Sequence, residues 1–232
     1  MLAHNPSVIT DGLVGYWDAA NLKSYPKSGT VWTDLSGNAN TGTLISGPLY
    51  DSGNGGSIVF DGSDDLVTLP SSNDLTGDNL QNCTAGMWLK TSTESNPYPF
   101  SIKRSDIHST LLSLVVNYVD VGDMGVLLRN NADSGHYHVL YNGGYNDGVW
   151  KYLVATVNDL DVNIYIDAVN RGNSSSGMQS VTGNTAYAAI GGFQSGSSHF
   201  DGNISIVKFY RKALSQAEIT QNFNAHRSRF GV

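Results

Sequence analysis

The stretch WTDLSGNANTGTL, residues 32–44, carries oxygen-bearing side chains at alternate positions, namely Asp34, Ser36, Asn38 and Asn40. Calcium prefers hard oxygen ligands, and this spacing resembles the first half of an EF-hand loop. The second half does not match, because Ala39 stands where the sharp turn needs Gly and Ile45 where a bidentate Glu belongs. Asx turns, in which Asp and Asn side chains bond to the nearby backbone, explain the same residues. The stretch therefore predicts either a calcium site of another type or a set of turns.

Carboxyl pairs for glycoside cleavage are not evident. Such chemistry usually needs two carboxyl groups facing each other across the scissile bond. Glu218 is explained as the helix-capping partner of Ser215, and Glu94 lies in the loop-like segment STESNPYP. The adjacent Asp64 and Asp65 are expected to point to opposite faces of a strand. We therefore expect a protein that is not an enzyme, with polysaccharide cleavage as the weakest alternative.

Histidines and aromatic residues give further candidates. His136 and His138 would share one face of a strand, a spacing that suits a transition metal, but no further ligands lie nearby and we interpret them as exposed strand residues. Aromatic rings near predicted loops could stack on sugars; these are Trp32, Tyr98, Tyr141 and Tyr145. In a sandwich most such residues belong to the core or to an edge.

The composition indicates a β-rich protein without a nucleic-acid or membrane partner. Charged residues make up 14% of the 232 positions, against about 25% in an average globular protein, and most acidic residues are the turn-favouring Asp. A formal net charge of -7 provides no basic stripe for a phosphate backbone. No apolar run approaches the roughly 18 residues of a membrane span. The single cysteine, Cys83, lies in the apolar run CTAGMWL and is expected to pack in the core.

Short apolar runs of β character recur along the chain, among them GLVGYW, LLSLVV, VWKYLVATV and ISIVKFY. Asp-Gly and Asn-Gly pairs between the runs supply the geometry of tight turns. We expect an all-β fold, a two-sheet antiparallel jelly-roll sandwich, over residues 13–232. Residues 1–12 are expected to form an N-terminal arm.

One short C-terminal helix is predicted at about residues 215–226. Ser215 and Glu218 form an S-x-x-E capping box, and Leu214 and Ile219 occupy the positions of a hydrophobic staple. Because the apolar stripe of this helix is narrow, we expect the helix to lie against an edge or end of the sandwich.

Several stretches together resemble the concanavalin A-like, laminin-G-like jelly rolls, in the same order: GLVGYWDAANLKSYPKSGTVWTDLSGNANTGTL, GGSIVFDGSDDLVTLP, GVWKYLVATVN with VNIYIDAVNRG, and FDGNISIVKFYRKALSQAEITQNFNA. The likeness covers residues 11–226. It implies two packed antiparallel sheets, and calcium and carbohydrate sites at loops on one rim or face. Carried onto matching positions, the resemblance implies Asp34, Asn38 and Asp201 as calcium ligands and no other cofactor. The sugar-binding aromatics of relatives have no position that we can match.

The opening HNPSVITDGLVGYWDAANLKSYP and the ending FNAHRSRFGV resemble stand-alone structural proteins of tailed phages, particularly cyanophages. This likeness implies a non-enzymatic virion protein, either a capsid decoration or a tail-associated component, made in the host cytoplasm. Its partners would be other capsid or tail proteins, attached through residues 1–12, residues 226–232 or one exposed sheet. A homo-oligomer is expected. The alternative is a carbohydrate-binding module or adhesin that recognises host-surface glycans.

Overall fold

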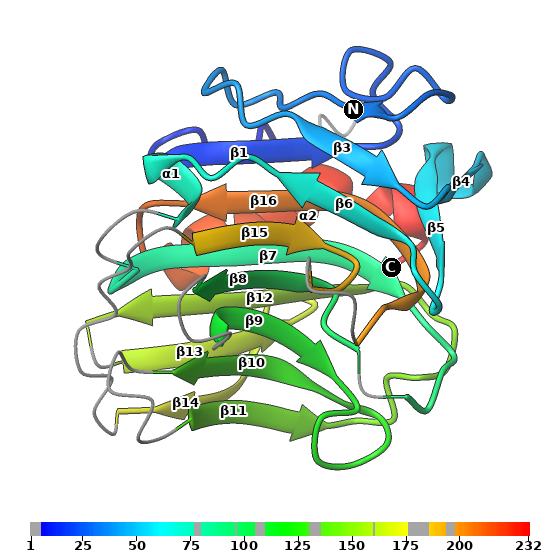
Figure 1. The fold of residues 1–232 in the computed structure, drawn as a ribbon. Helices are drawn as coiled ribbons and strands as arrows, with labels where there is room; N and C mark the ends of the chain where they lie inside the picture. Colours follow the sequence, from blue (N-terminus) through cyan, green and yellow to red (C-terminus); the bar gives the residue numbers. More distant parts are fainter. Residues whose placement is uncertain are drawn as a thin grey trace, which may run out of the picture.

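The computed structural model describes residues 6–76, 80–95, 97–104, 110–129, 136–159, 161–175, 186–193 and 198–232. Two antiparallel β-sheets pack face to face as a sandwich, with one helix at the C-terminal end of the chain (Figure 1). The predicted all-β jelly-roll sandwich is therefore confirmed.

Each sheet has eight strands in the described part of the chain. Sheet A contains, in spatial order, β14 (Val169–Ser174), β13 (Asp161–Ile166), β12 (Lys151–Asn158), β7 (Asn82–Lys90), β16 (Asp201–Tyr210), β5 (Ser57–Asp61) and β4 (Leu49–Asp51), with β1 (Leu13–Asp18) also paired to β16. Sheet B contains β11 (His136–Asn142), β10 (Asp123–Arg129), β9 (Thr110–Val116), β8 (Phe100–Arg104), β15 (Ala186–Ile190), β6 (Leu66–Leu69), β3 (Gly42–Ile45) and β2 (Val31–Trp32).

The main core lies between the two sheets. Its largest aromatic side chains are fully buried, namely Trp17, Trp32, Phe60, Phe100, Phe200 and Phe209. An aromatic residue removes about 150–250 Å² of surface from water, which stabilises the fold by roughly 4–6 kcal/mol before the entropy of ordering the chain is counted. Cys83 also lies in this core, where burial raises the pKa of its thiol to about 12. Its predicted packing role is confirmed.

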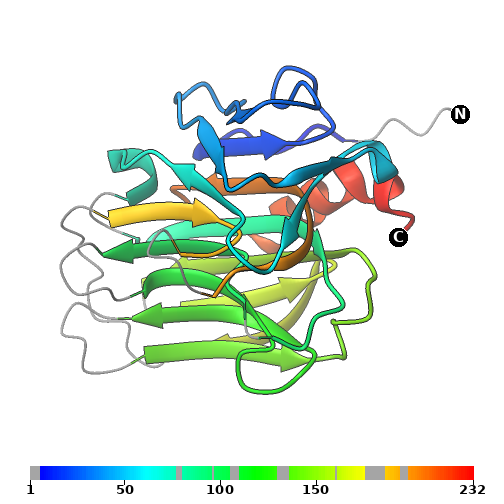
Figure 2. The same cartoon turned by 45° about the vertical axis from the view of Figure 1, so that its right-hand side comes forward.

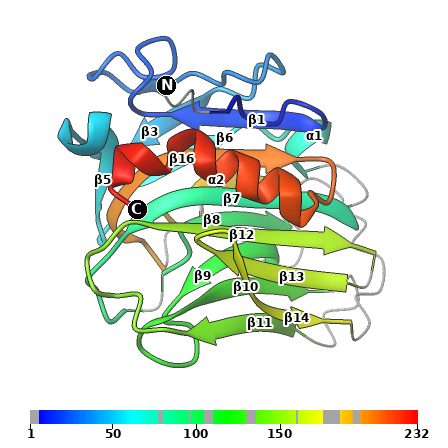
Figure 3. The ribbon, with the colours of Figure 1, turned by 180° about the vertical axis from the view of Figure 1, so that it is seen from behind.

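Helix α2 (Gln216–Phe230) lies across the outer face of sheet A (Figures 2 and 3). The predicted capping box is present, because the side chain of Ser215 accepts from the backbone N–H of Glu218 and the Glu218 carboxylate accepts from the backbone N–H of Ser215. The expected position at an edge or end of the sandwich is wrong, and the helix continues to Phe230. Trp88 of β7 is the reason: its ring stacks on Phe223 and Phe230 at centroid distances of 5.5 and 4.1 Å.

The described part of the predicted N-terminal arm lies against α2. The backbone N–H of Ile9 donates to Oδ1 of Asn222 at 2.9 Å, and the Tyr210 hydroxyl donates to the Ile9 carbonyl at 3.1 Å. The Gln221 side chain donates to the carbonyl of Ser7 at 2.9 Å. The short elements η1 (Gly53–Gly55) and α1 (Asn73–Thr76) complete the described helices, none of which combines the length and apolar character needed to cross a membrane.

Candidate functional site

Asp34 is the centre of a hydrogen-bonded turn. It is 8% exposed, and its carboxylate accepts from the backbone N–H groups of Tyr16, Ser36 and Asn40 at 2.8–3.0 Å. The Ser36 hydroxyl donates a further hydrogen bond at 2.7 Å. Since both carboxylate oxygens are engaged, turn chemistry accounts for Asp34 and fixes this loop to β1.

The predicted calcium ligands do not meet. Asn38 is exposed in the same turn as Asp34, but Asp201 begins β16. Asp34 bonds to Tyr16, which pairs with Lys208, seven residues further along β16. At about 3.3 Å per residue, the separation is about 23 Å. The structure therefore does not assemble Asp34, Asn38 and Asp201 into one site.

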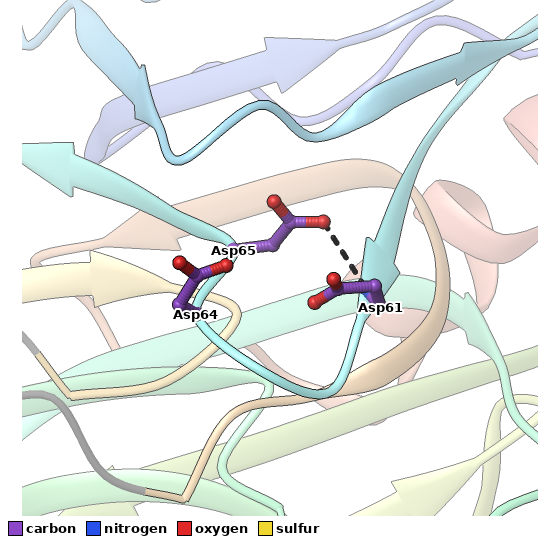
Figure 4. Close-up of side chains that lie close together, drawn as sticks. All are labelled: Asp61, Asp64 and Asp65. Carbon is purple, nitrogen blue, oxygen red and sulfur yellow. Dashed lines mark hydrogen bonds between the residues drawn. The ribbon is translucent and has the colours of Figure 1, made fainter.

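Three aspartates form a group that we call the acidic cluster: Asp61 at the end of β5, and Asp64 and Asp65 in the loop that leads to β6 (Figure 4). One carboxylate oxygen from each lies within 4.8 Å of the others. Asp65 is 5% exposed, and its Oδ2 accepts from the backbone N–H of Asp61 at 3.1 Å. The prediction that Asp64 and Asp65 point to opposite faces of a strand is wrong, because Asp64 lies in the connecting loop rather than in a strand.

The electrostatics of the acidic cluster suit a hard cation. Burial raises the pKa of Asp65, and the neighbouring carboxylates of Asp61 and Asp64 raise it further. The pKa of Asp61 is lowered, chiefly because the backbone N–H of Ser63 donates to it at 2.8 Å. The donor set of carboxylate oxygens fits the ligand preference of calcium. Asp201 pairs with Asp61 across the sheet, so one of the predicted calcium ligands lies beside this cluster.

A line of ring side chains, which we call the aromatic chain, lies on the outer face of sheet B. It consists of Phe193, Tyr98, Tyr118 and His138, whose successive ring centroids are 4.3, 6.1 and 5.9 Å apart. His138 is exposed, both tyrosines are half-buried and Phe193 is 8% exposed, so ring surface reaches solvent mainly at the His138 end. The Ser101 hydroxyl of β8 donates to the carbonyl of Gly192 at 2.7 Å and holds the Phe193 end on the sheet.

A polar groove of about 560 Å³ adjoins His138 at the edge of the sandwich, where β11 of sheet B meets β14 of sheet A. Its polar lining includes Asp120, His138, Asn142 and Asn173. Gly172 allows this meeting of edges, because a Cβ there would lie 3.2 Å from Cγ1 of Val139. His138 thus belongs both to the aromatic chain and to the groove.

The turn that forms one wall of the groove is held by a buried carboxylate. Asp123 is 1% exposed, and its oxygens accept from the backbone N–H groups of Tyr118, Val119 and Asp120 at 2.7–3.0 Å. These bonds fix the backbone of the turn, so Asp120 is presented to the groove in a preorganised position.

The aromatic residues that were predicted near loops lie in different environments. Tyr98 belongs to the aromatic chain. Trp32 is fully buried and Tyr145 is 7% exposed, so both belong to the core. Tyr141 is partly buried beneath Arg171, whose guanidinium carbon lies 5.1 Å from the ring centroid.

Sequence reasoning missed the remaining members of the aromatic chain. Tyr118 lies just before the turn VDVGD, and this position predicts an aromatic ring at a loop. Nothing local predicts that Tyr118 and the distant Phe193 both contact Tyr98. The interpretation of His138 as an exposed strand residue is confirmed. The side chain of His136 lies outside the described residues.

Comparison with known proteins identifies the family. A sequence model matches residues 61–220, which is more than half of the chain. The chain belongs to the concanavalin A-like lectin/glucanases superfamily. The match confirms, at the level of the family, the resemblance drawn from the sequence. No curated protein matches it.

Solved structures of the same fold include binding domains of toxins. The binding domain of Paraclostridial Mosquitocidal Protein 1 is 13% identical, with a TM-score of 0.72, and the match covers 93% of this chain and 52% of that one. The botulinum neurotoxin serotype D ligand binding domain, solved in complex with N-acetylneuraminic acid, is 12% identical, with a TM-score of 0.69 and coverages of 93% and 51%. The chain spans about half the length of these toxin domains.

A third solved structure corresponds over nearly its whole length. Domain 4 of AbnA, a GH43 extracellular arabinanase from Geobacillus stearothermophilus in complex with arabinotriose, is 19% identical, with a TM-score of 0.67. The match covers 90% of this chain and 97% of that domain. At these identities the three likenesses show the fold alone.

Proposed function

We propose that this protein is a non-catalytic glycan-binding domain whose binding surface is the aromatic chain together with the polar groove. The observation that carries the proposal is that His138 joins the two. A sugar presents an apolar ring face and a rim of hydroxyl groups, so its recognition needs an exposed ring next to fixed hydrogen-bonding groups. The surface from Tyr118 through His138 to Asp120 and Asn173 supplies both.

The expected affinity is modest. Net hydrogen bonds to groove side chains contribute about 1 kcal/mol each, and stacking of one sugar face adds a comparable amount. Four such contributions sum to about 4 kcal/mol, which corresponds to a Kd of about 1 mM. Two structural neighbours were solved in complex with carbohydrates, arabinotriose and N-acetylneuraminic acid, which supports the choice of glycans as the ligand class.

The test is a glycan array followed by calorimetric titration of the best binder. We expect His138→Ala and Tyr118→Ala to weaken binding at least tenfold. Leu22→Ala is the control, because Leu22 is 63% exposed and lies outside both the groove and the aromatic chain. Absence of binding to every glycan, or equal affinity of the His138 variant and the wild type, would reject this function.

A virion-surface location is a second proposal, supported by the phage-like ends of the sequence. The described N-terminal residues and α2 lie together on the outer face of sheet A, because Gln221 bonds to Ser7. We propose attachment to a capsid or tail protein through that side, as a homo-oligomer, with sheet B facing outward. Residues 226–230 are the last turn of α2, so a free C-terminal tail cannot include them. A reconstruction of the intact particle in which the outer face of sheet A touches no other protein would reject this location.

A further inference from the structure

The polar groove carries one available negative charge. Asp120 is exposed, and within the described residues no hydrogen bond or ion pair engages its carboxylate. Asp123 also lines the groove, but its carboxylate is buried and occupied by backbone N–H groups. No Lys or Arg is among the residues that line the groove in the described part of the chain.

Two described cations of the sandwich, Arg171 and Lys103, lie over aromatic rings. The guanidinium of Arg171 on β14 lies over Tyr141, 5.1 Å from its ring centroid. The ammonium of Lys103 lies over Phe193, 4.6 Å from its ring centroid, at the end of the aromatic chain opposite His138. A ligand carboxylate in the groove would therefore meet a like charge without a counter-charge on the lining.

We propose that the groove selects uncharged oligosaccharides and excludes sialic and uronic acids, and that Asp120 is the residue that determines this specificity. The inference rests on the proposed glycan-binding function. Asp120 can accept hydrogen bonds from two neighbouring hydroxyl groups of a neutral sugar, and charge-assisted bonds of this kind are the stronger ones. The same carboxylate repels an acidic sugar, so attraction to one class and repulsion of the other come from one group. The groove volume of about 560 Å³ suits a short oligosaccharide.

The experiment compares matched ligand pairs that differ by a carboxylate. 3′-Sialyllactose is paired with its uncharged methyl ester, and polygalacturonate oligosaccharides are paired with their uncharged methyl esters. We expect the wild type to favour the neutral member of each pair at least tenfold at low ionic strength. Asp120→Asn should reduce this preference to about twofold or less, with part of the change coming from tighter binding of the acidic member. The wild-type preference should also shrink in 1 M salt, because screening weakens a repulsion in an open groove.

Asp74→Asn is the control, since it changes net charge equally, and exposed Asp74 on α1 does not line the groove. Its neutral-to-acidic ratio should equal that of the wild type. Binding of acidic glycans as tight as neutral ones, lost in His138→Ala, would overturn the specificity while leaving the glycan-binding function in place. An unchanged ratio in Asp120→Asn would overturn the role of Asp120. If no glycan of either class binds, the proposed function fails and the specificity fails with it.

Discussion

Replacement of the buried Lys208 by methionine should stabilise the protein. Lys208 lies on β16 opposite Tyr16 of β1, beneath α2, and is 1% exposed. Its Nζ has no hydrogen-bond partner within the described residues, and it lies over the ring of Tyr16, 5.0 Å from the ring centroid. Methionine keeps most of the volume and removes the need to bury an amine.

The magnitude follows from the pKa of Lys208, which burial lowers from 10.5 to about 7. The folded state then binds fewer protons than the unfolded state, so the free energy of unfolding falls as the pH drops from 10.5 to 7 and changes little below that. Linkage puts the penalty at about 4 kcal/mol at pH 7 and about 2 kcal/mol at pH 9. Lys208→Met removes this penalty but also the contact with Tyr16, worth about 1–2 kcal/mol. We expect a net gain of about 2–3 kcal/mol at pH 7.

Urea denaturation at pH 7, 8 and 9 measures both the stability gained by Lys208→Met and the pH dependence of the free energy of unfolding. The wild type should gain about 2 kcal/mol more than Lys208→Met between pH 7 and pH 9. Lys23→Met is the control, because Lys23 is exposed in a loop, and it should leave the pH dependence unchanged. If Lys208→Met has the same pH slope as the wild type, then Lys208 does not bury a neutral amine and the reasoning is refuted.

Three further predictions concern α2 and the acidic cluster. Phe230→Ala should lower the free energy of unfolding by about 3–5 kcal/mol, because Phe230 stacks on Trp88 at 4.1 Å and packs at a tilt against Trp150 at 4.8 Å. An unchanged urea midpoint would show that the helix is not docked there. His226 has its pKa lowered to about 2 by burial and by the charges of Lys208 and Arg229, so stability is lost as the pH falls below 6.5. Between pH 6.5 and pH 4.5, the free energy of unfolding of His226→Gln should therefore fall by about 2 kcal/mol less than that of the wild type in parallel urea titrations. An identical fall in both proteins over this pH range would argue against this. Calcium bound at the acidic cluster, at a hundred times its Kd, should stabilise the protein by about 2.7 kcal/mol and raise the Tm above its value in chelator. The double variant Asp61→Asn with Asp64→Asn should abolish this rise. Equal Tm values with calcium and with chelator would remove the site from consideration.

Local chemistry was predictable from the sequence, whereas long-range juxtaposition was not. The capping box of Ser215 and the turn at Asp34 were predictable because each depends on residues within a few positions. The run CTAGMWL of β7 lacks polar alternation, and both faces of this strand are in fact buried. Nothing in this run predicts that α2 packs over Trp88.

The groove was beyond sequence reasoning for a related reason. Asp120 lies in the turn between β9 and β10 of sheet B, whereas Asn173 lies on β14 of sheet A. They face one groove only because the edge strands β11 and β14 meet at Gly172. Lys208 occupies an outward position of a period-two strand, which would ordinarily be wet. Lys208 is buried because α2 packs over it. Neither its low pKa nor its effect on stability could therefore be predicted from the run ISIVKFY.

The position of α2 makes ligand affinity and stability separable. No residue of α2 lines the groove in the described part of the chain, and α2 covers the outer face of sheet A, where Trp88 and Tyr152 stack at 5.2 Å. Phe230→Ala should therefore lower stability and leave glycan affinity unchanged under conditions in which the protein is folded. Asp120→Asn should do the reverse, altering affinity with a stability change within about 0.5 kcal/mol. If Phe230→Ala instead creates or strengthens glycan binding, then the aromatic surface beneath α2 is the binding face, and the assignment of the site to sheet B is wrong.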